Sequence, residues 1–130
     1  MHAYPFEKLN VWQCGRVLNK QIYEITKNLP NDEKFGITSQ LRRASISVIC
    51  NLAEGSARVK GKEQARFSEI AYGSLMEVLN LLITCADLDY ISSAHVQGIR
   101  PFIEEISRKI NALRLSQLEK HKRQKNAPSQ

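Results

Sequence analysis

Apolar side chains recur every three, four or seven residues in four stretches of the chain. This spacing puts them on one face of an α-helix, because a helix turns once every 3.6 residues or so, about 100° per residue. The stretches cover residues 7–28, 32–54, 62–87 and 93–119; the first shows the pattern through Val11, Leu18, Ile22, Ile25 and Leu29. The pattern predicts an all-α protein with four helices.

Proline, glycine and serine residues mark where these helices should begin and end. Pro30 disfavours helix at the residue before it and ends the first helix. Gly55 is placed to end the second helix in the left-handed conformation. A Ser-Ser pair at residues 92–93 can cap the fourth helix. Pro101 falls inside that helix without shifting the phase of its apolar stripe, which predicts one bent helix rather than two.

The connections between the predicted helices are short, so consecutive helices should pack as antiparallel neighbours. We therefore expect an up-down-up-down four-helix bundle formed by a single domain, residues 1–119. Residues 120–130 are polar and basic, and we expect them to form a disordered tail.

The second and third helices carry more apolar surface than a single bundle needs. The apolar side chains of residues 78–86 span about 200° of the helix circumference, whereas a surface helix needs a stripe of about 100°. The second helix has an extra apolar face formed by Ile46, Ile49 and Ala53. Exposed apolar faces favour association, so we expect self-association through these two helices. Gly73 and Ser74, inside the third helix, favour the close approach of a neighbouring helix.

A polar stripe separates the two apolar faces of the second helix. Its residues follow at intervals of three or four, so they share one helix face. They are Gln40, Arg43, Ser47, Asn51 and Glu54. We expect this stripe to form a hydrogen-bond ladder between helices or between subunits. The alternative is that it is the solvated face of a monomer.

The cysteines Cys14, Cys50 and Cys85 are odd in number and widely spaced. Without a Cys-x-x-Cys pair they predict no zinc site, and their apolar neighbours favour buried thiols. No uncharged run exceeds ten residues, well short of the roughly 20 that a membrane span needs. Residues 1–10 lack the pattern of a signal peptide. We expect a cytoplasmic protein without a membrane partner.

Catalytic and cofactor motifs are sparse in this chain. The paired Glu-x-x-His motifs of carboxylate-bridged metal sites are missing. Residues 55–63 resemble a phosphate-binding P-loop, but five residues instead of four separate the glycines, and Glu63 stands where Ser or Thr is required. We expect no metal, no cofactor and no enzymatic activity. An enzymatic function would need Arg43, Asn51 and Glu54 to line one closed pocket.

Positive charge gives the clearest indication of a partner. The chain has 19 Lys and Arg against 13 Asp and Glu, a net charge of +6, which favours a polyanion such as nucleic acid. One basic cluster surrounds Gly61, where side chains and unpaired backbone N–H groups can seat a phosphate. It contains Arg58, Lys60, Lys62 and Arg66; a second cluster contains Arg114, Lys120, Lys122, Arg123 and Lys125. Solubilising surface charge is the alternative explanation for both.

Three segments of the chain match a known family. They are Phe6-x-x-Leu9-x-Val11-Trp12, the run from Leu29-Pro30 through Gln40-Leu41-Arg42-Arg43-Ala44 to Asn51-Leu52-Ala53-Glu54-Gly55, and Ile70-Ala71-x-Gly73-Ser74-Leu75-x-Glu77. Over residues 6–91 the chain resembles the four-helix-bundle proteins encoded by intervening sequences of bacterial 23S ribosomal RNA genes. That family also takes in the accessory protein of diversity-generating retroelements.

The resemblance implies a homopentameric barrel of four-helix protomers around a central channel. It also implies possible partners, because the accessory relatives are basic, bind nucleic acid and contact a reverse transcriptase. The family's polar signature falls on Gln40, Arg42, Arg43, Asn51 and Glu54. For these residues the resemblance implies a role in assembly or in ligand binding.

Two hypotheses follow for the function. In the first, a non-enzymatic homo-oligomeric bundle binds structured RNA, ribosomal RNA included, or DNA. In the second, a protein-interaction scaffold recruits a protein partner and its charge is incidental. The predicted nucleic-acid-binding residues are Arg58, Lys60, Lys62, Arg66, Lys120, Lys122 and Arg123. The predicted oligomer interface and polar ladder consist of Gln40, Arg42, Arg43, Ile46, Ser47, Ile49, Asn51 and Glu54.

Overall fold

The computed structural model describes residues 1–127 and consists of helices joined by short turns. Its α-helices are α1 (Asn10–Thr26), α2 (Ile37–Ser56), α3 (Gly61–Asp87) and α4 (Ser93–Lys125). Two short 3₁₀ helices, η1 (Pro5–Lys8) and η2 (Asn31–Glu33), precede α1 and α2. No strand occurs within residues 1–127, so the predicted all-α fold with four helices is confirmed.

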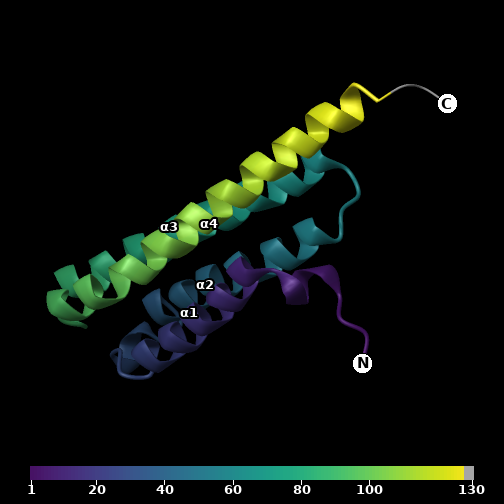
Figure 1. The fold of residues 1–130 in the computed structure, drawn as a ribbon. Coiled ribbons are helices and arrows are strands. Elements are labelled where there is room, and N and C mark those ends of the chain that lie inside the picture. Colours follow the sequence, from purple (N-terminus) through teal and green to yellow (C-terminus); the bar gives the residue numbers. More distant parts are fainter. Residues whose placement is uncertain (128–130) are drawn as a thin grey trace.

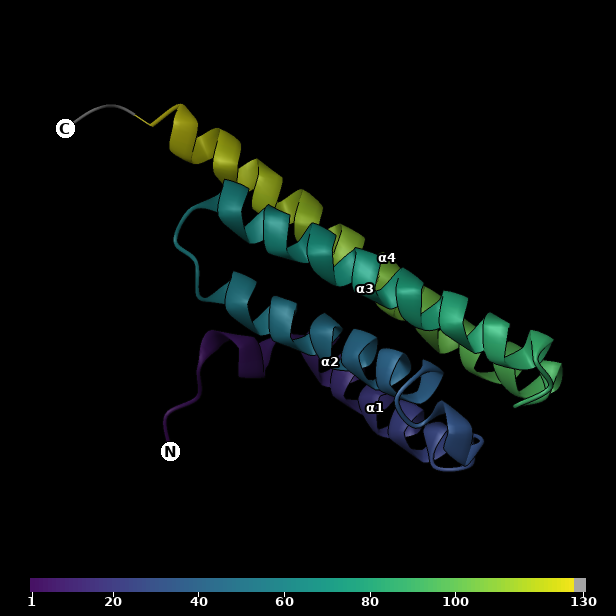
Figure 2. The ribbon, with the colours of Figure 1, turned by 180° about the vertical axis from the view of Figure 1, so that it is seen from behind.

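Consecutive helices run antiparallel and lie side by side (Figures 1 and 2). Helix α2 packs against both α1 and α3, and α3 packs against both α2 and α4. Helices α1 and α4 touch only sparsely. The arrangement is the predicted up-down-up-down order, and the side of the bundle between α1 and α4 is the least closed.

The core consists of the apolar stripes seen in the sequence. Each helix contributes side chains that are almost completely buried. They are Leu18 and Ile22 from α1, Leu41 and Val48 from α2, Leu75, Val78 and Leu82 from α3, and Ile103, Ile106 and Ile110 from α4. Burying an aliphatic side chain of this size stabilises the folded state by about 1.5–3 kcal/mol, so this shared core holds the four helices together.

Helix α2 begins and ends later than the sequence predicts. It begins at Ile37, because the preceding residues Asn31–Glu33 form η2. It then continues through Gly55 to Ser56, and no glycine within residues 1–127 has a positive φ. The prediction that Gly55 ends the helix in the left-handed conformation is therefore wrong. Gly55 is buried, and a Cβ there would lie 2.9 Å from the Cβ of Phe67, so small size explains this glycine.

Helix α4 is a single helix that contains Pro101, as predicted. Ser92 caps its N-terminus, where Ser92 Oγ accepts a hydrogen bond from the backbone N–H of His95 at 3.0 Å. The helix runs to Lys125, six residues past the expected boundary at residue 119, so residues 120–125 of the expected tail are helical in the structure. Gln124 explains the extension, because its amide bonds to the α2–α3 connection. Residues 128–130 of the predicted tail lie outside the described residues.

Gly73 lies on the exposed side of α3, and no side-chain atom or other helix lies within 4 Å of a Cβ built there. The predicted close approach of a neighbouring helix is therefore wrong for Gly73 within the chain. The adjacent residue Ser74 does reach α2, where Ser74 Oγ and Ser47 Oγ lie 2.8 Å apart. The two positions differ because consecutive residues point about 100° apart around a helix.

The three cysteines differ in exposure. Cys85 is completely buried, and that burial raises the pKa of its thiol. Cys14 is half-buried, and Cys50 is exposed on α2. The expectation of buried thiols is therefore correct for Cys85 and wrong for Cys50, which lies off the core stripe of its helix.

The turn between α3 and α4 is tied to η2, the short helix that precedes α2. Asp89 in this turn has a positive φ of 61°. Tyr90 donates a hydrogen bond from its hydroxyl to Glu33 Oε2 at 2.9 Å, and this bond raises the pKa of Tyr90. The contact fixes the end of the bundle that lies opposite the α2–α3 connection.

One helix of residues 1–127, α3, is long and apolar enough to cross a membrane by length and composition alone. Its buried side chains pack against α2 and α4, as those of a core helix in a bundle do.

Candidate nucleic-acid interface

The first basic cluster lies on the connection between α2 and α3 and on the first turns of α3. Arg58, Lys60, Lys62 and Arg66 are all exposed, and Glu63 is the acidic residue among them. The Arg58 guanidinium lies 4.8 Å from the centre of the Phe67 ring, a cation–π contact that the sequence did not indicate. Gln64 Nε2 donates to the Arg58 carbonyl at 2.8 Å, so the backbone of the connection is fixed.

The second basic cluster meets the first because α4 packs against Gly61. The Gly61 N–H donates to Gln124 Oε1 at 2.8 Å, and Gln124 Nε2 donates to the Val59 carbonyl at 3.1 Å. A Cβ on Gly61 would lie 2.5 Å from the Gln117 carbonyl oxygen and 2.6 Å from the His121 nitrogen. The Gly61 N–H is therefore paired with Gln124 and is not one of the unpaired N–H groups that could seat a phosphate.

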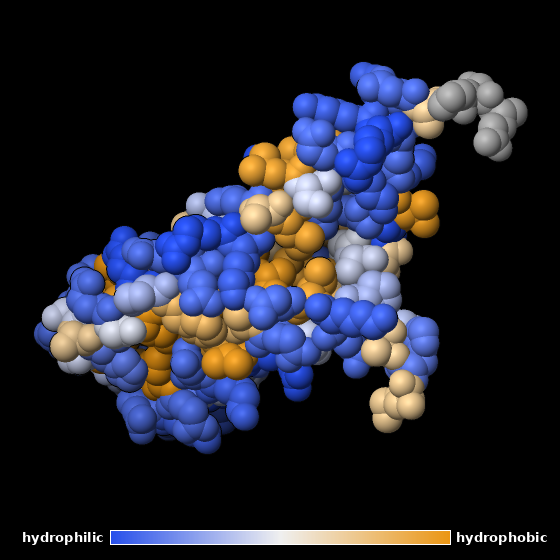
Figure 3. All heavy atoms as spheres, viewed as in Figure 1, coloured by the Kyte–Doolittle hydropathy of each residue, from blue (hydrophilic) through white to orange (hydrophobic). Residues whose placement is uncertain are grey.

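This contact brings together two segments that are far apart in the sequence, residues 57–66 and 117–125, at one end of the molecule (Figures 1 and 2). Hydrophilic side chains dominate this end in Figure 3. We call it the basic end and define it by the predicted binding residues Arg58, Lys60, Lys62, Arg66, Lys120, Lys122 and Arg123. Sequence spacing gave no indication that the two clusters would be neighbours.

Most cations of the basic end have no carboxylate partner within the described part of the chain. Five ion pairs occur in residues 1–127, and of the basic-end cations they involve Lys122 alone, with Glu119 at 3.4 Å. Arg114, from the same helix, pairs with Glu69 at 3.7 Å. The remaining cations are available to an external anion.

The basic end includes a small open pocket of about 240 Å³ that is lined by four segments of the chain. We call it the end pocket. Its cationic side chains are Lys120 and Arg123 on α4. Its other lining residues are Pro5, Leu9, Ser56, Gln64, Leu113, Ser116 and Gln117. Gln117 is buried, and Ser68 Oγ donates to Gln117 Oε1 at 2.6 Å.

Part of the polar stripe on α2 faces α3 of the same chain. Ser47 and Ser74 are joined through their hydroxyl groups, and Asn51 Nδ2 donates to the Ser47 carbonyl at 2.8 Å and to Ser47 Oγ at 3.0 Å. Gln40 and Arg43 line a shallow cavity over the same seam. The sequence predicted a hydrogen-bond ladder either between helices or between subunits. A hydrogen bond between helices is present at Ser47 and Ser74.

Other residues of the predicted interface point elsewhere. Arg42 packs against α1: its guanidinium lies 4.5 Å from the centre of the Tyr23 ring, and its Nε donates to Thr26 Oγ1 at 2.8 Å. Ile49 also faces α1, because its Cγ2 would lie 2.6 Å from a Cβ on Gly15. Ile46 points outward and is 38% exposed. The residues of the predicted interface therefore face three different surroundings: α3, α1 and the outer surface.

The broad apolar arc of α3 is used mainly inside the chain. Val78, Leu81, Leu82 and Cys85 are buried in the core, because α3 packs between α2 and α4. Ile83 is 39% exposed. The width of the arc therefore reflects two helical neighbours of the same chain as well as the exposed surface at Ile83.

Neither Asn51 nor Glu54 lines the cavity beside Arg43. The cavity beside Arg43 is lined by Gln40, Ser47, Ser74 and Glu77 together with Ala44. Asn51 is engaged by Ser47, and Glu54 is exposed at the end of α2. The condition set above for an enzymatic function is not met by this cavity.

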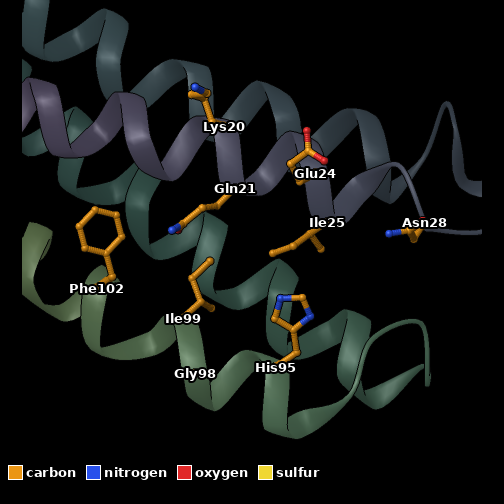
Figure 4. Close-up of a pocket in the computed structure, with 9 residues that line it drawn as sticks. All are labelled: Lys20, Gln21, Glu24, Ile25, Asn28, His95, Gly98, Ile99 and Phe102. Carbon is orange, nitrogen blue, oxygen red and sulfur yellow. The ribbon is translucent and has the colours of Figure 1, made fainter.

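A larger cleft of about 630 Å³ lies between α1 and α4. In Figure 4, Ile25 of α1 and Ile99 of α4 point toward one another, with Phe102 beside them and the Gln21 amide directed toward α4. A Cβ on Gly98 would meet no atom of another helix within 4 Å, so the cleft stays open there. Lys20 and Glu24 both line it, so it lacks the single sign of charge found in the end pocket.

The fold and this site together define a class: a small all-helical protein with four antiparallel helices and cationic residues gathered at one end. A family model described as 23S rRNA-intervening sequence protein matches residues 7–112, and the chain belongs to this family. The match includes the first basic cluster and ends before Lys120, Lys122 and Arg123. A search of curated proteins gave no match.

Proposed function

We propose that this protein is a non-enzymatic, cytoplasmic nucleic-acid-binding protein that holds structured RNA, or DNA, at its basic end. The observation that carries the proposal is the Gly61 contact, which joins residues 57–66 to residues 117–125. Most cations of these two segments have no carboxylate partner within residues 1–127. Family membership supports an RNA-related role, although the family description names a gene context and not a ligand.

The chemistry of the basic end favours contacts to phosphates over contacts to bases. Lys and Arg side chains on an exposed surface neutralise phosphates, and such binding weakens steeply as salt rises. Phe67 is the aromatic residue beside this cluster, and its ring is already covered by Arg58. We therefore expect weak sequence specificity.

Self-association is the second part of the proposal. Ile46 is partly exposed on the outer side of α2, next to the exposed Cys50, and α3 exposes Ile70 and Ile83. Apolar surface of this kind on neighbouring helices supports an interface between copies of the chain. The resemblance to pentameric barrels supports five copies.

The alternative function is a scaffold that recruits a protein partner, a reverse transcriptase among the candidates. The cleft between α1 and α4 favours this alternative, because Ile25, Ile99 and Phe102 line an open groove between two helices. An amphipathic helix of a partner protein can occupy a groove of this type.

The test is charge reversal at the first basic cluster. We expect the Arg58→Glu, Lys60→Glu, Lys62→Glu and Arg66→Glu quadruple variant to bind a structured RNA hairpin at least on the order of 100-fold more weakly, because phosphate contacts supply most of the affinity. The matched control reverses four exposed cations elsewhere: Lys20→Glu, Lys27→Glu, Lys34→Glu and Arg108→Glu. Fluorescence anisotropy measures the affinity, and circular dichroism checks helicity.

The control should keep most of its affinity, since it changes the net charge equally but leaves the basic end intact. An equal loss in both variants would show that net charge alone drives binding and would overturn the assignment of the site. A wild-type protein that binds neither RNA nor DNA at low salt would overturn the proposed function in favour of the scaffold.

A further inference from the structure

The end pocket differs from four other surface cavities in the charge of the residues that line it. Among five surface cavities formed by residues 1–127, the other four each include a carboxylate, from Glu24, Glu63, Glu69 or Glu77. The end pocket has Lys120 and Arg123 and no Asp or Glu. A concave surface lined by one sign of charge raises the local concentration of the opposite ion.

The end pocket also presents hydrogen-bond donors that the fold has already oriented. Gln117 is 8% exposed, and its Oε1 accepts a hydrogen bond from Ser68. The Gln117 amide nitrogen is therefore left as a donor in the lining of the pocket. Gln64 is similarly held, because one N–H of its amide donates to the Arg58 carbonyl and the other remains. Gln117 is buried and Gln64 is half-buried, so two amide groups held by hydrogen bonds lie beside the two cations. Amide and cationic donors of this kind suit a bound anion.

The size and walls of the end pocket indicate what part of a ligand enters it. A volume of about 240 Å³ is smaller than that of pockets that enclose a drug-sized ligand, which measure about 300–1,000 Å³. Pro5, Leu9 and Leu113 supply an apolar wall. The pocket suits one anionic group with the sugar attached to it, and not a longer segment of a strand.

The charge of the pocket matches a phosphomonoester. A phosphodiester carries a single negative charge, whereas a phosphomonoester carries about −1.5 to −2 at pH 7. Lys120 and Arg123 are two cations, neither of which is in an ion pair within residues 1–127. Arg123 can also form two parallel hydrogen bonds to phosphate oxygens.

We propose that the end pocket binds a terminal phosphomonoester, so that the protein recognises the phosphorylated end of a nucleic acid as well as its backbone. This inference rests on the proposed function, because the same basic end holds the rest of the strand. A free mononucleotide carries the same chemical group and is the other source of such a ligand.

The test compares three RNA hairpins of one sequence, with a 5′-phosphate, a 3′-phosphate, or hydroxyls at both ends. We expect the wild-type protein to bind one of the phosphorylated hairpins about tenfold more tightly, as one additional charge-assisted hydrogen bond provides. The Lys120→Gln, Arg123→Gln variant should lose this preference and keep its affinity for the hydroxyl hairpin within about twofold of a control. The control is Lys122→Gln, Lys125→Gln, which removes two cations of the same helix outside the pocket.

Thermal denaturation with adenosine 5′-monophosphate and with adenosine separates the two sources of the group. The pocket is supported if the monophosphate, but not adenosine, stabilises the wild type and does not stabilise the Lys120→Gln, Arg123→Gln variant. This result supports the pocket whether or not RNA binds. If RNA does not bind, the free nucleotide is the ligand and the proposed function fails. Equal affinity for all three hairpins, with no effect of the monophosphate, overturns this inference. Salt-dependent binding of the hairpins in that case leaves the proposed function intact.

Discussion

Gly61 carries the contact on which the basic end depends. A side chain at this position would meet the Gln117 carbonyl oxygen and the His121 nitrogen, which are backbone atoms. A backbone atom cannot move aside as the tip of a flexible side chain can. The glycine is therefore required for close packing and not for an unusual φ, since its φ is not positive.

We expect Gly61→Ala to displace the last turns of α4 and to lower the free energy of unfolding by about 1–3 kcal/mol, the cost of overpacking. Chemical denaturation measures the free energy, and amide hydrogen exchange should show weaker protection at residues 120–125. The matched control is Gly73→Ala, where the new methyl group meets no other helix. The control should be about 1 kcal/mol more stable than wild type, because alanine favours helix over glycine. Unchanged stability and protection in Gly61→Ala would contradict the packing described here.

Helix α2 presents three different surfaces. One edge packs on α1 through Arg42 and Ile49, another meets α3 through Ser47, and the outer side exposes Ile46. The first two edges are satisfied within the chain. The outer side is the one that the proposed self-association would use.

We expect Ile46→Glu to reduce the mass of the wild-type assembly to that of the 14.8 kDa monomer, because a charge in an apolar interface is costly to bury. Helicity should remain, since Ile46 does not belong to the core. Size exclusion with light scattering measures the mass. Val17→Glu places the same charge at an exposed position of α1 and should leave the assembly intact. A monomeric wild type, or an unchanged mass for Ile46→Glu, would refute assembly through this side of α2.

The whole molecule is electrically uneven along its length. The basic end lies at the α2–α3 connection, while Asp32, Glu33, Asp87 and Asp89 lie near the turns at the opposite end of the bundle. Such separation orients a polyanion toward the basic end before contact, an effect that salt screens.

The salt dependence of binding should therefore report on the basic end. We expect the logarithm of the affinity to fall linearly with the logarithm of salt concentration. Replacing Arg58, Lys60, Lys62 and Arg66 by Gln should flatten that slope by about 3, since each phosphate contact contributes about 0.7–0.9. Titrations of one RNA hairpin across a salt series measure both slopes. An affinity loss with an unchanged slope would mean that these side chains do not contact phosphates.

The sequence by itself determined the features that depend on local spacing. Four helices, their apolar stripes, the serine cap of α4 and the continuity of that helix across Pro101 could all be predicted, because helical periodicity and capping involve residues only a few positions apart. The first basic cluster could be found for the same reason. The family motifs also consist of short segments within single helices and turns.

Only the tertiary structure decided which distant segments become neighbours. Residues 57–66 meet residues 117–125, Gln124 bonds to the α2–α3 connection, and four segments line the end pocket. All three features depend on where helices of different length end beside one another. The division of α2 between three surroundings and the exposure of Cys50 depend on which helix lies on each side. Periodicity distinguishes a buried face from an exposed one, but it carries no information about the partner that covers a face.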